Sequence, residues 1–283
     1  MTRVALVADR SSTELFADGP LLLAALKDVG IAAEIVPWGN GTHWAAFDAA
    51  LIRTTWDYIL DREAFLDWAA RVSTLTRLAN SVEVLQWNTD KRYLRDLEAA
   101  GVATVPTMWV DRGEAVPVVE WDDFVVKPSV SAGARLSARY RRGDDPSDHI
   151  RDIHAIGAAA MIQPYVPSVD KEGETGTYVF GGRVSHAIRK GTILESSRPP
   201  SHDLADASLE SVRPTLVDPE LSGFALRVLE TAPPVLYARV DTAPGVDGQP
   251  ILLELELTEP YLFLALAPHG AGNFARAVAS WLK

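Results

Sequence analysis

The chain has 283 residues, of which 47% are hydrophobic and 23% charged, as is ordinary for a soluble globular enzyme with two or three packed lobes. Its net charge of −11 argues against a general nucleic-acid binder, because no broad basic surface is available. The absence of cysteine excludes disulfides and thiolate chemistry, and no apolar stretch approaches the roughly 18 residues that span a bilayer.

Strand and helix patterns alternate through the first third of the chain. Short apolar runs at 4–8, 33–37 and 49–53 indicate strands, and the stretches at 19–29 and 62–72 indicate helices. This alternation predicts a small open α/β sheet with mostly parallel strands, which would bind a ligand at the carboxyl ends of its strands. No signal-peptide pattern precedes the first strand, so we expect a cytoplasmic protein with neither a membrane nor a nucleic-acid partner.

Arg53 ends the third predicted strand and heads a loop that carries Trp56 and Tyr58. The forked guanidinium of Arg53 could hold a substrate carboxylate at two points, although a surface salt bridge explains an arginine here equally well. Trp56 and Tyr58 could line the substrate pocket or pack between lobes. The sequence leaves these alternatives open.

The middle of the chain predicts a helix and a strand with a loop of small residues. The helix covers 88–101, with Asn88 or Thr89 as its N-cap and Gly101 as its stop. An apolar strand at 124–128 carries Lys127, and the loop SVSAGARL follows it with Ser129, Ser131 and Gly133. A lysine with small residues suits phosphate, but the loop has neither the Walker A nor the Rossmann order, and most such loops are only turns.

The last part of the chain predicts strands at 161–170, 177–180 and 183–191, the first of which runs into a proline-rich linker. The stretch 191–218 is polar and irregular, and connections of this length are usually functional lids or disordered. Two further strand patterns, VLYARVD and ILLELEL, are joined by the turn-rich segment APGVDGQP, which predicts a hairpin.

This hairpin concentrates charge. Because strand side chains alternate between faces, Arg239 and Asp241 would share one face, and Glu254 and Glu256 would share one face with Leu253 pointing away. Pairing would gather three carboxylates and one guanidinium, a donor set that suits Mg²⁺ with a nucleotide phosphate. The alternative is a solvated hairpin face.

The order of these motifs resembles that of the ATP-grasp superfamily across essentially the whole chain. The series runs from Asp90-Lys91 through VVKP with its loop and QPYV to the RxD…ExE pair. The resemblance implies an N-terminal α/β domain at 1–86 and two α+β lobes, at 87–165 and 166–283, that hold ATP between them.

The resemblance also implies roles for single residues. Phosphates would be contacted by Lys91 and Lys127 with the Ser129 and Ser131 loop, adenine by the backbone of Gln163, Pro164, Tyr165 and Val166, and the ribose by Asp170. Asp241, Glu254 and Glu256 would hold two Mg²⁺ ions, with Mn²⁺ as an alternative, and Arg239 would face the charge that develops in the reaction. Lys190 and Arg198 would reach the γ-phosphate. Two departures stand out: Glu256 replaces the Asn of many relatives, and the phosphate loop has one glycine.

Within the superfamily the chain is most similar to the cycloserine synthetase type, through DKRYLRDLEAAGV, QPYVPSVDKEGET, SHAIRKG and RVDTAPGVDGQPILLELELTEPYL. This resemblance implies an ATP- and Mg²⁺-dependent ligase of antibiotic biosynthesis. It would activate the carboxylate of a small amino-acid-like substrate as an acyl phosphate for attack by nitrogen, within one molecule as in D-cycloserine formation from O-ureido-D-serine.

Glu174 resembles an acidic position near the substrate. His186 could face the substrate or be a structural histidine. Other functions stay open: an intermolecular ligase of the glutathione-synthetase or ribosomal-protein-modification type, a non-catalytic nucleotide-binding module, and a kinase on the same fold. The sequence does not decide whether the chain forms a homo-oligomer.

Overall fold

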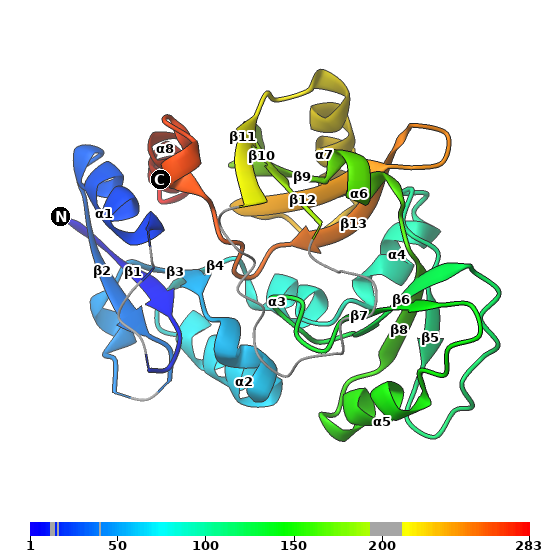
Figure 1. The fold of residues 1–283 in the computed structure, drawn as a ribbon. Helices are drawn as coiled ribbons and strands as arrows, with labels where there is room; N and C mark the ends of the chain where they lie inside the picture. The colour runs from blue at the N-terminus through cyan, green and yellow to red at the C-terminus, as the bar shows by residue number, and fades with distance from the viewer. Residues whose placement is uncertain (12–14, 16, 40, 193–210) are drawn as a thin grey trace.

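In a computed structural model, which describes residues 1–11, 15, 17–39, 41–192 and 211–283, the chain folds around three β-sheets (Figure 1). No helix in these described ranges combines the length and the apolar character that crossing a membrane requires.

The first sheet is the predicted parallel one. Strands β1 (Thr2–Ala8), β2 (Ile31–Pro37), β3 (Ala49–Thr54) and β4 (Arg77–Ala79) pair in the order β2-β1-β3-β4. On β1, Leu6 packs with α1 (Asp18–Asp28), and Val7 faces the aromatic core of α2 (Arg62–Ser73). Both faces of the sheet are therefore covered, which explains why its strands are continuous apolar runs.

The second sheet is antiparallel, in the order β5-β8-β6-β7, with β5 at Met108–Val110, β6 at Asp123–Pro128, β7 at Ala138–Arg141 and β8 at Ala160–Pro164. Helix α5 (Ser147–Ala155) covers it through a core that includes Ile150 and Ile153. The predicted strand at 161–170 ends early, because residues 168–172 form the short helix α6 (Ser168–Glu172).

The predicted helix at 88–101 is wrong in its first turn. Helix α3 (Val82–Asn88) ends at Asn88, the chain turns through Asp90 and Lys91, and α4 (Tyr93–Ala99) follows. The Asn88 side chain donates to the Leu255 carbonyl at 2.8 Å and accepts from the Leu257 N–H at 2.8 Å. Asn88 thus binds a neighbouring strand instead of capping a helix. The predicted stop at Gly101 is confirmed by its positive φ of 86° directly after the helix.

The third sheet is antiparallel, in the order β11-β10-β9-β12-β13. Its strands are β9 (Glu174–Phe180), β10 (Arg183–Lys190), β11 (Val212–Thr215), β12 (Tyr237–Pro244) and β13 (Pro250–Glu256). Strand β11 corrects the prediction that 191–218 is irregular throughout. Arg198 lies outside the described residues.

Helices cover both faces of this third sheet. One face packs on α7 (Pro219–Thr231) together with α3 and α4, where Phe224 meets Ala238 and Val240 of β12. The other face meets α8 (Gly270–Trp281), which also packs against α1, so the C-terminal helix joins this sheet to the N-terminal domain (Figure 1). Short 3-10 turns lie at Trp44–Ala46 (η1), Trp56–Leu60 (η2) and Leu264–Leu266 (η4). The domain boundaries at 86/87 and 165/166 stay predictions.

Candidate active site

The charged hairpin is formed by β12 and β13, and its register brings the predicted residues together. Asp241 pairs with Glu254, and Arg239 pairs with Glu256 across the antiparallel ladder. Ala238 and Val240 alternate with them on β12 and face the core under α7, so the charged pair points to the opposite face. With Asp241 only 1% exposed, a solvated hairpin face is not what this structure has.

A β-bulge interrupts the predicted alternation of β13. Asp241 pairs with Glu254, whereas Thr242 pairs with Leu252, so Leu253 is the extra residue. Leu253 and Glu254 both line the cavity described below, and the prediction that Leu253 points away is wrong. The bulge therefore adds an apolar side chain to the wall beside the acidic residues.

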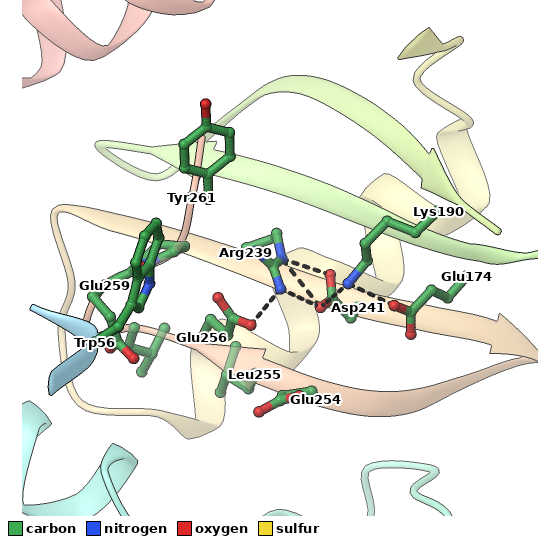
Figure 2. A network of polar contacts seen from close by, with 12 residues as sticks. Trp56, Glu174, Lys190, Arg239, Asp241, Glu254, Leu255, Glu256, Glu259 and Tyr261 are labelled. Carbon is green, nitrogen blue, oxygen red and sulfur yellow. Dashed lines mark hydrogen bonds and ion pairs between the residues drawn. The ribbon is translucent and has the colours of Figure 1, made fainter. Parts of the chain in front are cut away.

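Asp241 is the centre of a buried ionic network (Figure 2). Arg239 donates to its carboxylate through Nε at 2.9 Å and through Nη2 at 2.8 Å, and the Lys190 ammonium lies 2.9 Å away. Lys190 also pairs with Glu174 at 2.6 Å, and Arg239 also pairs with Glu256. Side chains from four neighbouring strands therefore share their charges at one point of the sheet.

The network sets the protonation of its members. Burial works to raise the pKa of Asp241, but Arg239 and Lys190 outweigh it and hold that pKa below its usual range. Burial and Arg239 work to lower the pKa of Lys190, but Asp241 and Glu174 outweigh them and raise it. Glu256 differs, because burial raises its pKa to about 7 in spite of the neighbouring Arg239.

The side chains around Asp241 leave no room for a side chain at Gly176. Gly176 lies on β9 opposite Asp241, and a Cβ atom there would lie 2.9 Å from the Asp241 Oδ1 and 3.2 Å from the Arg239 Cδ. A glycine at this position lets the ionic pair lie flat against the neighbouring strand.

Two further cations, Lys91 and Lys127, line the same cavity. The Lys91 ammonium pairs with Glu254 at 3.2 Å and donates to the Ser131 carbonyl at 2.9 Å. Lys127 lines the cavity from β6, and among the described residues its ammonium has no hydrogen-bond or ion-pair partner. Burial lowers the pKa of Lys127. Lysines of this kind are suited to contact an anionic ligand.

The loop after β6 has an unusual backbone. Gly133, Ala134 and Leu136 all have left-handed φ values, of 58°, 57° and 51°. Left-handed non-glycine residues cost on the order of 1 kcal/mol or more each and tend to cluster at functional sites. The buried His149 helps to fix this conformation, since its Nε2 bonds the Leu136 carbonyl at 3.0 Å. Ser129 lies behind the loop, fully buried and away from the cavity lining.

These groups surround one cavity of about 690 Å³. Residues from all three sheets or their connections line it, including Trp56, Tyr58, Lys91, Lys127, Ser131, Gly133, Gln163, Pro164, Tyr165, Val166, Glu174, Lys190, Arg239, Glu254, Glu256, Glu259 and Tyr261. Pockets of this size take small organic ligands. Most of the predicted site residues therefore share one space.

Asp170 lies in α6 and is not among the lining residues, although its neighbour Val169 is. Its carboxylate accepts from the Tyr165 hydroxyl and from Arg139 at 3.3 Å, and Arg139 covers the Tyr165 ring at 3.5 Å. Thr192 donates to the same carboxylate at 3.3 Å. Asp170 thus joins α6 to the segment that was predicted to read adenine.

Two predicted substrate residues lie elsewhere. Arg53 is 2% exposed, donates to the Pro260 carbonyl at 2.5 Å and stacks over the Tyr237 ring, so it is neither a surface salt bridge nor part of the cavity wall. His186 stacks on Tyr178 at 4.2 Å, and its Nε2 bonds the Leu262 carbonyl at 2.9 Å. Burial lowers the pKa of His186 to about 4. The alternative that His186 is a structural histidine is therefore correct. The prediction that it contacts the substrate is wrong, since His186 is not part of the cavity wall.

Glu259 and Tyr261 also line the cavity, and sequence reasoning missed both. Tyr261 packs near Trp56, and the Trp56 Nε1 donates to the Glu259 carbonyl at 3.3 Å. Burial raises the pKa of the Glu259 carboxyl to about 8, and Glu256 adds to the shift. Their position three to five residues after Glu256 was the available signal, because a segment that leaves a charged strand end stays near that end.

The carboxylates fit a hard cation in their chemistry. Within the described ranges, no group of three or more Asp, Glu or His side chains is arranged as a ready metal site. Glu254 and Glu256 nevertheless line the cavity with oxygen donors of the kind that Mg²⁺ prefers, and the raised pKa of Glu256 is relieved by added positive charge. Asp241 could bind the same cation only if its ion pair with Arg239 or with Lys190 were broken.

Known proteins resemble this chain over its full length. A family model described as the N-terminal domain of D-cycloserine synthetase DcsG matches residues 4–80. The cycloserine biosynthesis protein DcsG of Streptomyces lavendulae is 37% identical over 300 residues, covering 99% of this chain and 99% of that protein.

Solved structures give the same picture. The crystal structure of D-cycloserine synthetase DcsG has a TM-score of 0.90 at 35% identity and covers 99% of this chain and 100% of that one. The ATP complex of D-alanine–D-alanine ligase from Bacillus anthracis has a TM-score of 0.71 at 17% identity, with 100% and 97% covered. The ATP-grasp ligase PsnB, complexed with minimal precursor, Mg and ADP, has a TM-score of 0.65 at 18% identity, with 99% and 98% covered.

Proposed function

This chain belongs to the D-cycloserine synthetase DcsG family, and we propose that it uses ATP to cyclise O-ureido-D-serine to D-cycloserine in this cavity. The chain is an ATP-dependent ligase that forms a carbon–nitrogen bond, and the predicted ATP-grasp fold is confirmed. The observation that carries the proposal is the shared cavity, where a cationic cluster faces the carboxylate hairpin.

The phosphate end of ATP would lie among the four cations of the cavity wall. Lys91 and Lys127 line the cavity from the turn before α4 and from β6, and Lys190 and Arg239 line it from β10 and β12. An anion entering this space would exchange with the carboxylates that now pair with Lys91 and Lys190. The loop at Ser131 and Gly133 would cover the phosphates with its backbone.

The adenine would lie against the segment from Gln163 to Val166. The Tyr165 N–H donates to the Asp123 carbonyl at 2.9 Å, and Pro164 has no N–H. The Val166 N–H is therefore the donor that we assign to the purine edge. Asp170, next to Tyr165, would accept from the ribose hydroxyls.

Asp241, Glu254 and Glu256 would hold Mg²⁺, two ions in our proposal, with Mn²⁺ as a substitute. When bound, the ions neutralise phosphate charge. The carboxylate of Glu256 would add to the affinity for cations. Arg239, which lies beside Glu256, would balance the negative charge on the reacting carboxyl group.

The substrate carboxylate takes the γ-phosphoryl group and becomes an acyl phosphate, leaving ADP. The N–H of the ureido group that is bonded to oxygen attacks the acyl carbon, a C–N bond forms, phosphate leaves and the nitrogen loses its proton. The ring still carries a carbamoyl group, which water removes as carbon dioxide and ammonia. The chain's residues hold the two anions together and neutralise them.

Turnover of O-ureido-D-serine with ATP and Mg²⁺ tests this function, with ADP, phosphate and the ring product measured by mass spectrometry. We expect one ADP for each ring formed. Glu254→Gln should abolish ring formation, and Glu230→Gln, on the exposed face of α7, is the matched control that should not change it. ADP release only with pairs of amino acids would favour an intermolecular ligase, and nucleotide binding without any ADP release would favour a binding module.

A further inference from the structure

Glu259 is a buried residue whose carboxyl group has no partner within the described part of the chain. Its side chain lines the cavity in a residue that is only 9% exposed, and no ion pair or hydrogen bond to the carboxyl is found among the residues that the structure describes. Figure 2 shows dashed contacts for Arg239, Asp241, Lys190, Glu174 and Glu256, but none for Glu259. Buried acidic groups are normally paired, so this one indicates an unfilled interaction.

A cation would satisfy this carboxyl group. Burial raises the pKa of Glu259 to about 8, which means that its ionised form is poorly stabilised by the protein alone. An amino-acid substrate carries a cation near neutral pH, its α-ammonium group. Binding of that group beside Glu259 would supply the missing charge.

The walls next to Glu259 suit an ammonium group as well. Trp56 and Tyr261 both line the cavity, with ring centroids 6.1 Å apart, and Trp56 is tied to the Glu259 backbone. Aromatic faces attract ammonium cations, most strongly where water is excluded. Figure 2 shows Trp56 beside Glu259 on the same side of the site.

Arg239 and Glu259 line the same cavity, as the two charged groups of an α-amino acid require. The carboxyl and ammonium groups of such a substrate are attached to one carbon, so its site must present a cation and an anion close together. Arg239 offers the cation, and Glu256 and then Glu259 follow away from it in Figure 2. A substrate carboxyl group at Arg239 would thus place its ammonium group toward Glu259.

The segment that carries Glu259 is firmly anchored. Arg53 donates to the Pro260 carbonyl, and the two carboxylate oxygens of Asp18 accept from the N–H groups of Leu262 and Leu264, each at 2.8 Å. These contacts come from the N-terminal sheet and its first helix. They make Arg53 a positioning residue for the cavity wall, without direct contact to the cavity.

We propose that Glu259, together with Trp56 and Tyr261, forms the subsite for the α-ammonium group of the substrate, an inference that rests on the proposed ligase function. The subsite would make the enzyme specific for carboxylic acids that carry a free amino group next to the carboxyl.

A comparison of O-ureido-D-serine with 3-(ureidooxy)propanoate, the same compound without its amino group, tests the subsite. In the unmodified enzyme, kcat/KM should favour the amino compound by about 10- to 100-fold, as expected for a hydrogen bond to a charged group. Glu259→Gln should remove most of this preference by raising KM, whereas KM for ATP stays unchanged. Glu259→Asp, which keeps the charge, should restore part of it. Glu230→Gln is the matched control.

The outcomes separate the two proposals. No ring formation by the unmodified enzyme would overturn the proposed function itself. Ring formation with an unchanged preference in Glu259→Gln would overturn only the subsite, as would a fall in kcat at constant KM, which would indicate proton transfer by Glu259. Thermal unfolding supplies a further readout: removal of an unpaired buried charge should leave the melting temperature equal or higher, and a clear decrease would contradict the subsite by showing a structural role.

Discussion

Replacement of Asp241 by Asn should destabilise the fold as well as stop turnover. The carboxylate receives both Arg239 and Lys190, which are only 6% and 7% exposed. The substitution would leave two buried cations with one anion fewer, while Glu174 and Glu256 still pair with them. Loss of one partner from a buried ion pair costs about 3–5 kcal/mol, and the remaining carboxylates place our expectation near about 3 kcal/mol.

Thermal unfolding followed by circular dichroism measures this effect. About 3 kcal/mol corresponds to a decrease in melting temperature of roughly 6–10 °C in a chain of this size class. The difference should depend on pH. Because the network lowers the pKa of Asp241, its contribution is present above the unfolded-state pKa and is lost as the pH falls through the lower folded-state value. The two proteins should therefore converge in stability only under strongly acidic conditions.

Glu254→Gln is the matched comparison, because Glu254 is also proposed to bind metal, but its side chain is 32% exposed and its ion-pair partner among the described residues is Lys91. It should abolish turnover with a smaller loss of stability than Asp241→Asn, because one end of the pair is reached by solvent and the buried Lys91 keeps its hydrogen bonds to Ser131. An Asp241→Asn protein with the melting temperature of the unmodified chain would refute the reasoning that this carboxylate holds the cations in place.

Three further changes test other parts of the structure. Gly176→Ala places a Cβ atom 2.9 Å from the Asp241 carboxylate, so turnover should fall at least about 10-fold and urea denaturation should show a loss of about 1–3 kcal/mol. Tyr237→Phe removes a buried hydroxyl that meets the carbonyls of Ile52, Ala79 and Thr258, and should cost about 1–3 kcal/mol in the same assay without changing the KM for ATP. Finally, the pKa of Glu259 is raised from 4.5 to about 8, so the folded state binds more protons in this window and stability falls as the pH rises through it. Glu259→Gln should reduce that decline by up to about 1.4 kcal/mol per pH unit, measured by denaturation at several pH values.

Patterns with a single structural solution were predictable from the sequence. The apolar runs of the first third indicated strands, and the hairpin pattern of VLYARVD and ILLELEL predicted that Arg239 and the acidic residues come together, which the ladder of β12 and β13 confirms. Local patterns of this kind depend on backbone geometry alone.

Features that depend on distant partners could not be predicted in this way. Arg53 ends a strand where a ligand could bind, but its actual partner, the Pro260 carbonyl, is 207 residues away. Asn88 has the side chain of a helix cap, yet it forms its hydrogen bonds with the backbone of Leu255 and Leu257. The bulge at Leu253 is defined by its pairing with β12, so the sequence of β13 alone does not reveal it.

The site also explains how an acidic chain can handle anionic ligands. Although the net charge is −11, four cations, Lys91, Lys127, Lys190 and Arg239, line one cavity. Among the described residues, three of them, all except Lys127, pair with carboxylates that are themselves proposed to bind metal. A nucleotide with its metal would bring both signs of charge together, so each cation could exchange a carboxylate for phosphate while the carboxylate gains Mg²⁺. Phosphate alone would leave the carboxylates without partners, and Mg²⁺ alone would do the same to the cations. The arrangement therefore favours the complete metal–nucleotide complex over either component.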